Sequence, residues 1–101
     1  MNYESENISF LNFIHALQGN VSENVRAVSL TLFPDSIIFH FILHRDDPET
    51  NEDIDDVVAE FAALQQQFTQ IDLDVRATDL PIDLSTFPGR LVFLKKDKRS
   101  Y

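Results

Sequence analysis

The chain has 101 residues, no cysteine, 44% hydrophobic residues and a formal net charge of −9. This length suits one domain with its own core, and the apolar content is that of a globular chain and not of a disordered one. The lack of cysteine excludes disulfide frameworks and thiolate metal sites. The most apolar stretch, residues 37–43, is too short to cross a bilayer, and the acidic N-terminus lacks the basic start of a secretory signal. We therefore expect a soluble, cytoplasmic protein without a membrane partner.

Hydrophobic periodicity in the first half of the chain predicts one helix and two strands. The helix covers residues 5–18 and ends before Gly19, because glycine tolerates the left-handed conformation that closes a helix. A strand with alternating apolar residues follows over residues 25–33, a second strand covers residues 37–44, and a turn that contains Pro34 separates them. Because both faces of the second strand are mostly apolar, we expect it in the centre of a sheet.

The second half predicts one helix and two strands. The helix covers residues 50–69, with Thr50 and Asp53 as a capping box at its start. A strand over residues 71–78 has one wet face, because its apolar residues alternate with polar ones. An irregular link over residues 79–89 leads to a last strand over residues 90–95, and residues 96–101 are a frayed tail. The apolar stripe of the helix contains Ile54, Val57, Val58, Phe61, Leu64 and Phe68.

These elements predict a single α+β domain with the order α-β-β-α-β-β. We expect one four-stranded antiparallel sheet with both helices packed on the same face. A weak internal echo, in which Val-Arg-Ala at residues 25–27 recurs at residues 75–77, would divide this fold into two αββ units. Chance explains the echo equally well, because strand and turn patterns look alike.

The residue types that carry catalysis are not arranged for it. His40 and His44 lie four residues apart on one strand, so about 13 Å separates their Cα atoms, and His15 belongs to a different element. Two glycines are too few for a phosphate-binding loop, and the acidic stretch lacks the central glycine of a calcium loop. We therefore predict no catalytic site, no cofactor and no metal site, and we predict that the protein is not an enzyme.

Charge is distributed unevenly along the chain. Sixteen acidic and three basic residues precede residue 90, whereas five bases and one acid follow from Arg90 onward. Residues 46–60 contain eight acids and no base, and they open the second predicted helix, so this charge lies on a structured element. Such a surface repels nucleic acid and attracts cationic partners. Protein binding is the function that this pattern favours, although acidic charge that only maintains solubility stays an alternative.

Residues 16–29 read ALQGNVSENVRAVS. The segment resembles the opening of a family of small bacterial immunity proteins of contact-dependent growth inhibition and related polymorphic toxin systems. In that family a helix ends in Leu-x-Gly, a Val-Ser-x-Asn loop follows, and Arg-Ala-Val-Ser starts the sheet. The later acids, the helix with Phe61 or Phe68, and the ending LVFLKK at residues 91–96 fit the family's order. One departure is ILHR at residues 42–45, where the family often has an aromatic residue followed by Phe-Asp-Gly.

The resemblance implies an immunity protein that binds the C-terminal toxin domain of a sister or neighbouring cell and blocks it. Such toxins are often nucleases with basic clefts, so an acidic surface suits the role. The runner-up is a non-catalytic interaction or regulatory module that self-associates through an open sheet edge, and an enzyme is third. Asp72 and Asp74, on the wet face of the third strand, are a second choice of contact site. The first choice is the set Asp46, Asp47, Glu49, Glu52, Asp53, Asp56 and Glu60.

Overall fold

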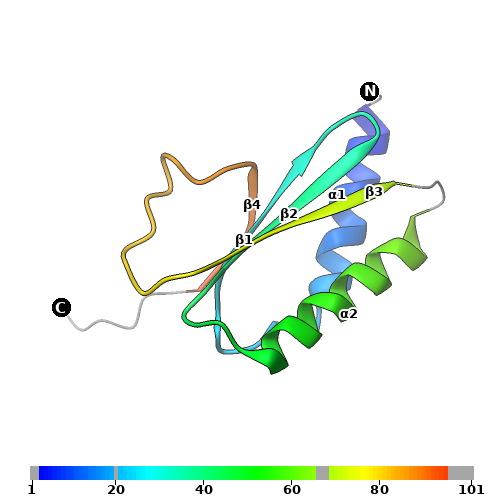
Figure 1. The fold of residues 1–101 in the computed structure, drawn as a ribbon. Helices are drawn as coiled ribbons and strands as arrows, with labels where there is room; N and C mark the ends of the chain where they lie inside the picture. Colours follow the sequence, from blue (N-terminus) through cyan, green and yellow to red (C-terminus); the bar gives the residue numbers. More distant parts are fainter. Residues whose placement is uncertain (1–2, 20, 66–68, 96–101) are drawn as a thin grey trace.

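The computed structural model describes residues 3–19, 21–65 and 69–95. Two helices and four strands follow one another in the predicted order α-β-β-α-β-β, which is confirmed (Figure 1). The predicted Phe68 and the tail at residues 96–101 lie outside the described residues. The elements are α1 (Tyr3–Leu17), β1 (Val25–Leu32), β2 (Ser36–Leu43), α2 (Pro48–Leu64), β3 (Gln70–Ala77) and β4 (Arg90–Leu94).

The four strands form one mixed sheet in the order β3-β2-β1-β4. β1 is antiparallel to both β2 and β4, but β3 runs parallel to β2, so the predicted all-antiparallel sheet is wrong. The cause is α2, which returns the chain to the end of the sheet where β2 began, so that the next strand must run in the same direction. A division into two αββ units is also wrong, because it would pair β3 with β4, and these strands lie at opposite edges.

Both helices pack on one face of the sheet, as predicted (Figure 1). Three fully buried rings, Phe13 of α1, Phe39 of β2 and Phe61 of α2, meet at the centre of the core. The ring of Phe39 lies with its centroid 4.3 Å from that of Phe13 and 5.1 Å from that of Phe61. Burying each ring contributes about 1.5–3 kcal/mol, so this cluster fixes both helices to the sheet. β2 is central in the sheet, as its apolar pattern predicted.

The start of α2 differs from the prediction. Asp47 is the N-cap residue and Pro48 is the first residue of the helix, so the helix begins two residues before Thr50. Proline suits this first position because its missing N–H would have no partner inside the helix and its φ is already helical. The capping box predicted at Thr50 and Asp53 is therefore wrong, and the helix ends at Leu64 and not at residue 69.

The link from β3 to β4 crosses the face of the sheet that carries no helix. The Ser29 hydroxyl of β1 donates a hydrogen bond to the carbonyl of Pro88, 2.6 Å away. Gly89 follows with a φ of 73°, and a Cβ atom there would lie 2.6 Å from both the Leu30 carbonyl oxygen and Thr31 Oγ1. Only glycine fits this approach, which places β4 beside β1.

Candidate protein-binding surface

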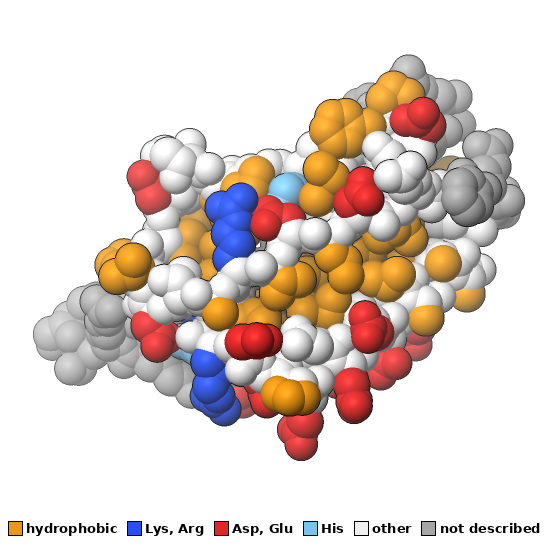
Figure 2. Space-filling model, in the orientation of Figure 1, with side chains coloured by type: hydrophobic (Ala, Val, Ile, Leu, Met, Phe, Trp, Pro, Cys, Tyr) orange, Lys and Arg blue, Asp and Glu red, His pale blue; other side chains and the backbone are white. Residues whose placement is uncertain are grey.

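The seven acids of the first-choice set lie on α2 and on the loop before it. Asp46, Glu49, Glu52, Asp56 and Glu60 are exposed, whereas Asp47 and Asp53 are half-buried. Residues three and four apart share one side of a helix, so the helical members form a continuous flank opposite the buried Ile54, Val57 and Phe61. Figure 2 shows carboxylates gathered along the outer edge of the molecule where α2 lies.

The charge on this flank is uncompensated. α2 contains no basic residue, and no ion pair within the described residues involves one of its carboxylates. Glu52 and Asp56 are four residues apart, as are Asp56 and Glu60, and each such like-charge pair costs about 0.2–0.5 kcal/mol of helix stability. Glu49 in the first turn gains from the positive end of the helix dipole, whereas Asp56 and Glu60 lie too far along the helix to do so. These like-charge pairs therefore oppose the folding of α2 and do not support it.

A buried polar network holds the start of α2 in place. The Asn24 side-chain amide donates to the Arg45 carbonyl at 2.8 Å and to Thr50 Oγ1 at 3.0 Å. The Thr50 hydroxyl in turn donates to Asp47 at 2.9 Å, and the Arg45 N–H donates to the Asn24 side-chain oxygen at 3.1 Å. Asn24 and Thr50 are both buried, so breaking one of these bonds leaves an unpaired polar group away from water.

This network changes the role of one predicted contact residue. Asp47 acts within the fold as the acceptor for Thr50, whereas Asp46 accepts a hydrogen bond from the exposed Asn51 amide at 3.1 Å. Sequence reasoning missed Asn24 and Thr50 as the residues that position the acidic loop. The available signal was the Val-Ser-x-Asn loop of the family resemblance, in which Asn24 is the last residue.

The second-choice acids lie elsewhere, on the helix-free face of the sheet. The parallel register places Asp72 beside Ile38 and Asp74 beside His40 of β2. Asp72 is exposed and accepts hydrogen bonds from the Gln70 side-chain amide, with 3.4 Å between the amide nitrogen and each carboxylate oxygen. The structure therefore separates these two acids from the α2 set and places them on a different surface.

Asp74 is neutralised by its neighbours. One of its carboxylate oxygens lies 2.7 Å from Nδ1 of the buried His40, whose Nε2 lies 2.7 Å from the Thr31 hydroxyl. The Arg76 guanidinium donates two hydrogen bonds to the same carboxylate, each 3.1 Å long. Partial burial alone would raise the pKa of Asp74, but the contacts with His40 and Arg76 outweigh it and hold the pKa below 3.8. Asp74 therefore serves as a structural anion.

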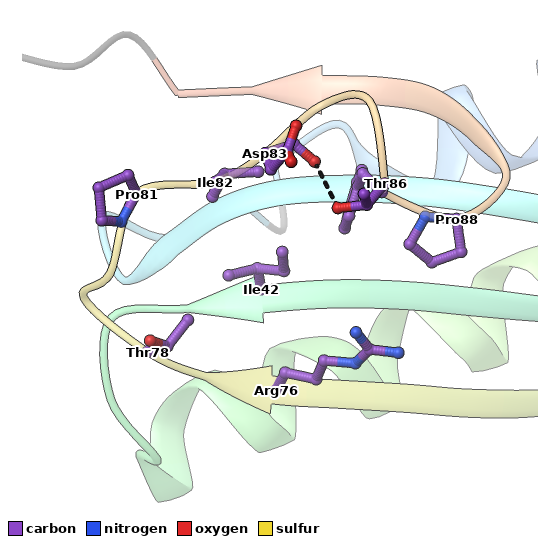
Figure 3. A pocket seen from close by; sticks show the side chains of 9 residues that line it. Ile42, Arg76, Thr78, Pro81, Ile82, Asp83, Thr86 and Pro88 are labelled. Carbon is purple, nitrogen blue, oxygen red and sulfur yellow. Dashed lines mark hydrogen bonds between the residues drawn. The ribbon is translucent and has the colours of Figure 1, made fainter.

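A depression of about 240 Å³ lies on the same helix-free face, beneath the link to β4 (Figure 3). Its lining combines Ile42 of β2 and Arg76 of β3 with Ile82, Pro88 and other residues of the link. The one carboxylate in the lining, Asp83, is exposed, and hydrogen bonds from the Ser85 hydroxyl and N–H lower its pKa. A lowered pKa favours the ionised form and does not suit a general acid. The lining offers no nucleophile paired with a base.

Three further observations bear on the kind of site. Within residues 3–19, 21–65 and 69–95, no group of three or more His, Cys, Asp or Glu side chains is arranged to hold a metal ion. Neither helix in this described part of the chain combines the length and the apolar character needed to span a bilayer. His44 lies on the surface, with its Nδ1 atom 2.8 Å from Asp79. The arrangement that stands out is therefore the unpaired acidic flank of α2.

Comparison with known proteins agrees with the sequence resemblance. No curated protein matches the chain. The family model described as MafI2 immunity protein matches residues 7–97, which covers most of the chain and includes every predicted contact residue. The chain therefore belongs to the MafI2 immunity protein family.

Proposed function

We propose that this chain neutralises a cognate toxin by binding the toxin's C-terminal domain with the acidic flank of α2. The observation that carries the proposal is the set of exposed α2 carboxylates that have no ion-pair partner in the described chain and destabilise their own helix. Membership in a family of immunity proteins supplies the class of partner. A cationic toxin surface would attract these carboxylates and so offset their mutual repulsion.

The toxin that best fits this surface is a nuclease with a basic cleft. A nuclease must attract phosphates, so its active site carries cationic side chains that an array of carboxylates can occupy in their place. The protein needs no catalytic group for this role, since occlusion of the cleft alone stops the reaction. We place the encounter in the cytoplasm of the producing cell, where an incoming nuclease would meet its substrate.

The rigid start of α2 supports binding in a defined geometry. The buried Asn24 and Thr50 side chains fix the loop at residues 44–47, so the acidic residues are presented with little ordering cost at association. Charged side chains at an exposed rim mainly raise the rate of association, while buried anchors set the lifetime of the complex. The expected complex is one-to-one, and it forms more slowly as salt is added.

The test combines growth rescue with association kinetics. The chain is co-expressed with the toxin domain encoded beside it, and growth and co-purification are measured. The variant Glu52→Gln/Asp56→Asn/Glu60→Gln removes three charges from the α2 flank, and we expect it to associate with the toxin on the order of tenfold more slowly at low salt.

A matched control removes the same number of charges elsewhere. Asp35→Asn/Asp72→Asn/Asp83→Asn changes three exposed acids outside α2, and we expect its association rate to stay close to that of the native chain. If the control slows association and the α2 variant does not, the helix-free face is the contact surface. Failure of the native chain to rescue growth or to co-purify with the toxin would overturn the immunity function itself.

A further inference from the structure

β3 is an edge strand with its backbone open on one side. Its only strand neighbour among the described residues is β2. The Gln70 N–H donates toward β2 to the Asp35 carbonyl, and the Thr78 N–H donates to the Leu43 carbonyl at 2.9 Å. Alternate residues of a strand direct their amides to opposite sides, so even-numbered residues face β2. The residues between them that direct N–H and C=O groups to the open edge are Ile71, Leu73, Val75 and Ala77.

The same strand exposes apolar side chains. The parallel register aligns Leu73 with Phe39 and Val75 with Phe41, so both side chains point to the helix-covered face. Because no strand of the described chain lies beyond them, Leu73 is 45% exposed and Val75 is 41% exposed. Figure 2 shows hydrophobic side chains gathered between the strand at this edge and α2. An open edge with apolar side chains is a template for a further strand.

On the helix-free face of β3, an acid and a base are spaced so that they can pair with the same two residues of a second copy. Asp74 and Arg76 are two residues apart on the same face and already form an ion pair, with 3.1 Å between the Arg76 guanidinium and the Asp74 carboxylate. An acid and a base at this spacing can face the same pair on an antiparallel copy of the strand with every charge opposite its counterpart. The matching partner for this edge is therefore a second copy of β3.

We propose that two copies of this chain associate by pairing their β3 strands antiparallel about a two-fold axis at Val75. This pairing forms a continuous sheet with four strands from each copy. Val75 lies opposite the partner's Val75, and Leu73 lies opposite the partner's Ala77. The Val75–Val75 and Leu73–Ala77 pairs are hydrogen-bonded pairs, because the odd-numbered residues direct their N–H and C=O groups to the open edge. The pairing adds about six hydrogen bonds between the two strands. The exposed apolar side chains of the two copies then cover one another.

This register also places the charges at the closest positions. Asp74 lies opposite the partner's Arg76, and Arg76 lies opposite the partner's Asp74. These are non-hydrogen-bonded positions, where the Cα atoms of an antiparallel pair are about 4.5 Å apart and the side chains are nearest. The Asp74 and Arg76 side chains of the two copies therefore lie close together around the axis, with opposite charges next to each other.

Neighbouring registers lack this complementarity. A two-fold axis at Leu73 places Asp72 opposite the partner's Asp74, and an axis at Asp74 places the two Asp74 carboxylates against each other. Like charges directly opposite in a sheet are destabilising, so of these three axes only the one at Val75 sets Asp74 and Arg76 opposite their counterparts without a like-charge pair. The net charge of −9 on each copy opposes association at low salt. At about 0.15 M salt, charges more than about 8 Å apart are screened, so this repulsion weakens more than the contacts between Asp74 and Arg76 of the two copies.

Single cysteine variants test both the dimer and its register, since the native chain has no cysteine. In the variant Val75→Cys, the two introduced thiols lie at a hydrogen-bonded pair with Cα atoms about 5.5 Å apart, within the range that a disulfide spans. In Leu73→Cys the equivalent Cα atoms are about 14 Å apart, too far to be joined. With oxidised glutathione and no toxin present, we expect Val75→Cys to form a covalent dimer and Leu73→Cys to stay monomeric on a non-reducing gel. Equal or preferential crosslinking of Leu73→Cys would overturn the register.

A second measurement does not depend on oxidation. Val75→Pro removes an N–H that faces the open edge, a position where an edge strand tolerates proline, whereas Val75→Thr keeps that N–H and the β-branched shape. In sedimentation over a concentration series, we expect dimers for the native chain and for Val75→Thr. We expect Val75→Pro to dissociate at concentrations at least about tenfold higher than the native chain does.

A native chain that is monomeric throughout the series overturns the proposal. If Val75→Pro then weakens toxin binding, the edge belongs to a toxin strand and not to a second copy. The crosslinking and sedimentation measurements use the chain alone, so a negative result in them does not count against toxin binding by α2.

Discussion

The acidic flank of α2 and the helix-free face of the sheet both carry carboxylates, but the structure treats them in opposite ways. Asp74 on the sheet contacts His40 and Arg76, so its charge is satisfied within the fold. Asp56 on α2 has acidic neighbours four residues away on either side, and none of the ion pairs of the described chain includes it. The contrast teaches that counting acids is not enough, because the fold compensates the carboxylate on the sheet and leaves those on α2 without an ion-pair partner among the described residues.

The largest expected effect comes from a substitution in the hydrophobic core, which supports both α2 and the sheet. Phe61→Ala deletes a fully buried ring from the core and should lower the free energy of unfolding by about 3–5 kcal/mol in urea denaturation. Leu64→Ala is the matched control, because Leu64 lies on the same helix but is 38% exposed, and it should cost less than about 1 kcal/mol. Similar losses for the two variants would contradict the central position of the phenylalanine cluster.

The next largest effect is a pH-dependent loss of stability when the ion-paired carboxylate of Asp74 is removed. The folded pKa of Asp74 is below the unfolded value of 3.8, so its stabilising contribution is present above about pH 3.8 and is lost as the pH falls through the folded pKa. Asp74→Asn should therefore lower stability by about 1.5–3 kcal/mol at neutral pH, and the difference from the native chain should shrink in acid. Asp72→Asn should leave the stability profile of the native chain nearly unchanged. A constant gap at every pH would assign the loss to packing and not to charge.

The smallest expected effect has the opposite sign. The variant Glu52→Gln/Asp56→Asn/Glu60→Gln relieves two like-charge pairs on α2, so it should raise the free energy of unfolding by about 0.5–1 kcal/mol while it slows toxin association. Thermal and urea unfolding of the free protein measure the first quantity. A variant that is less stable than the native chain would show that these acids contribute to folding, and the contrast between the two regions would fail.

The sequence was sufficient for local structure and insufficient for long-range arrangement. The spacing of Val57 and Phe61 indicated the buried face of α2, and the apolar residues on both faces of β2 indicated its central position, because burial leaves a pattern within each element. The direction of β3 could not be predicted from its pattern, since Leu73 and Val75 alternate with acids in the same way in either direction. The order of the strands depends on where α2 and the link at residues 78–89 carry the chain, which no local pattern records.

In the candidate site, too, local features were predictable from the sequence and long-range contacts were not. The exposure of Glu52 and Glu60 on α2 follows from helical spacing and was predictable. The pairing of Asp74 with His40 was not, because it requires β3 to lie beside β2 in a parallel register. The role of Asp47 as acceptor for Thr50 depends on the start of α2 at Pro48, which the apparent capping box concealed.

Gly89 has a consequence for the two edges of the sheet. Its close approach to Leu30 lets β4 lie along β1, so the eight-residue β1 is covered at that edge of the sheet. The strand left at the edge, β4, has only five residues, whereas β3 at the opposite edge has eight. A short edge strand offers fewer free backbone groups to an added strand, so Gly89 makes the two edges of the sheet unequal in what they can recruit.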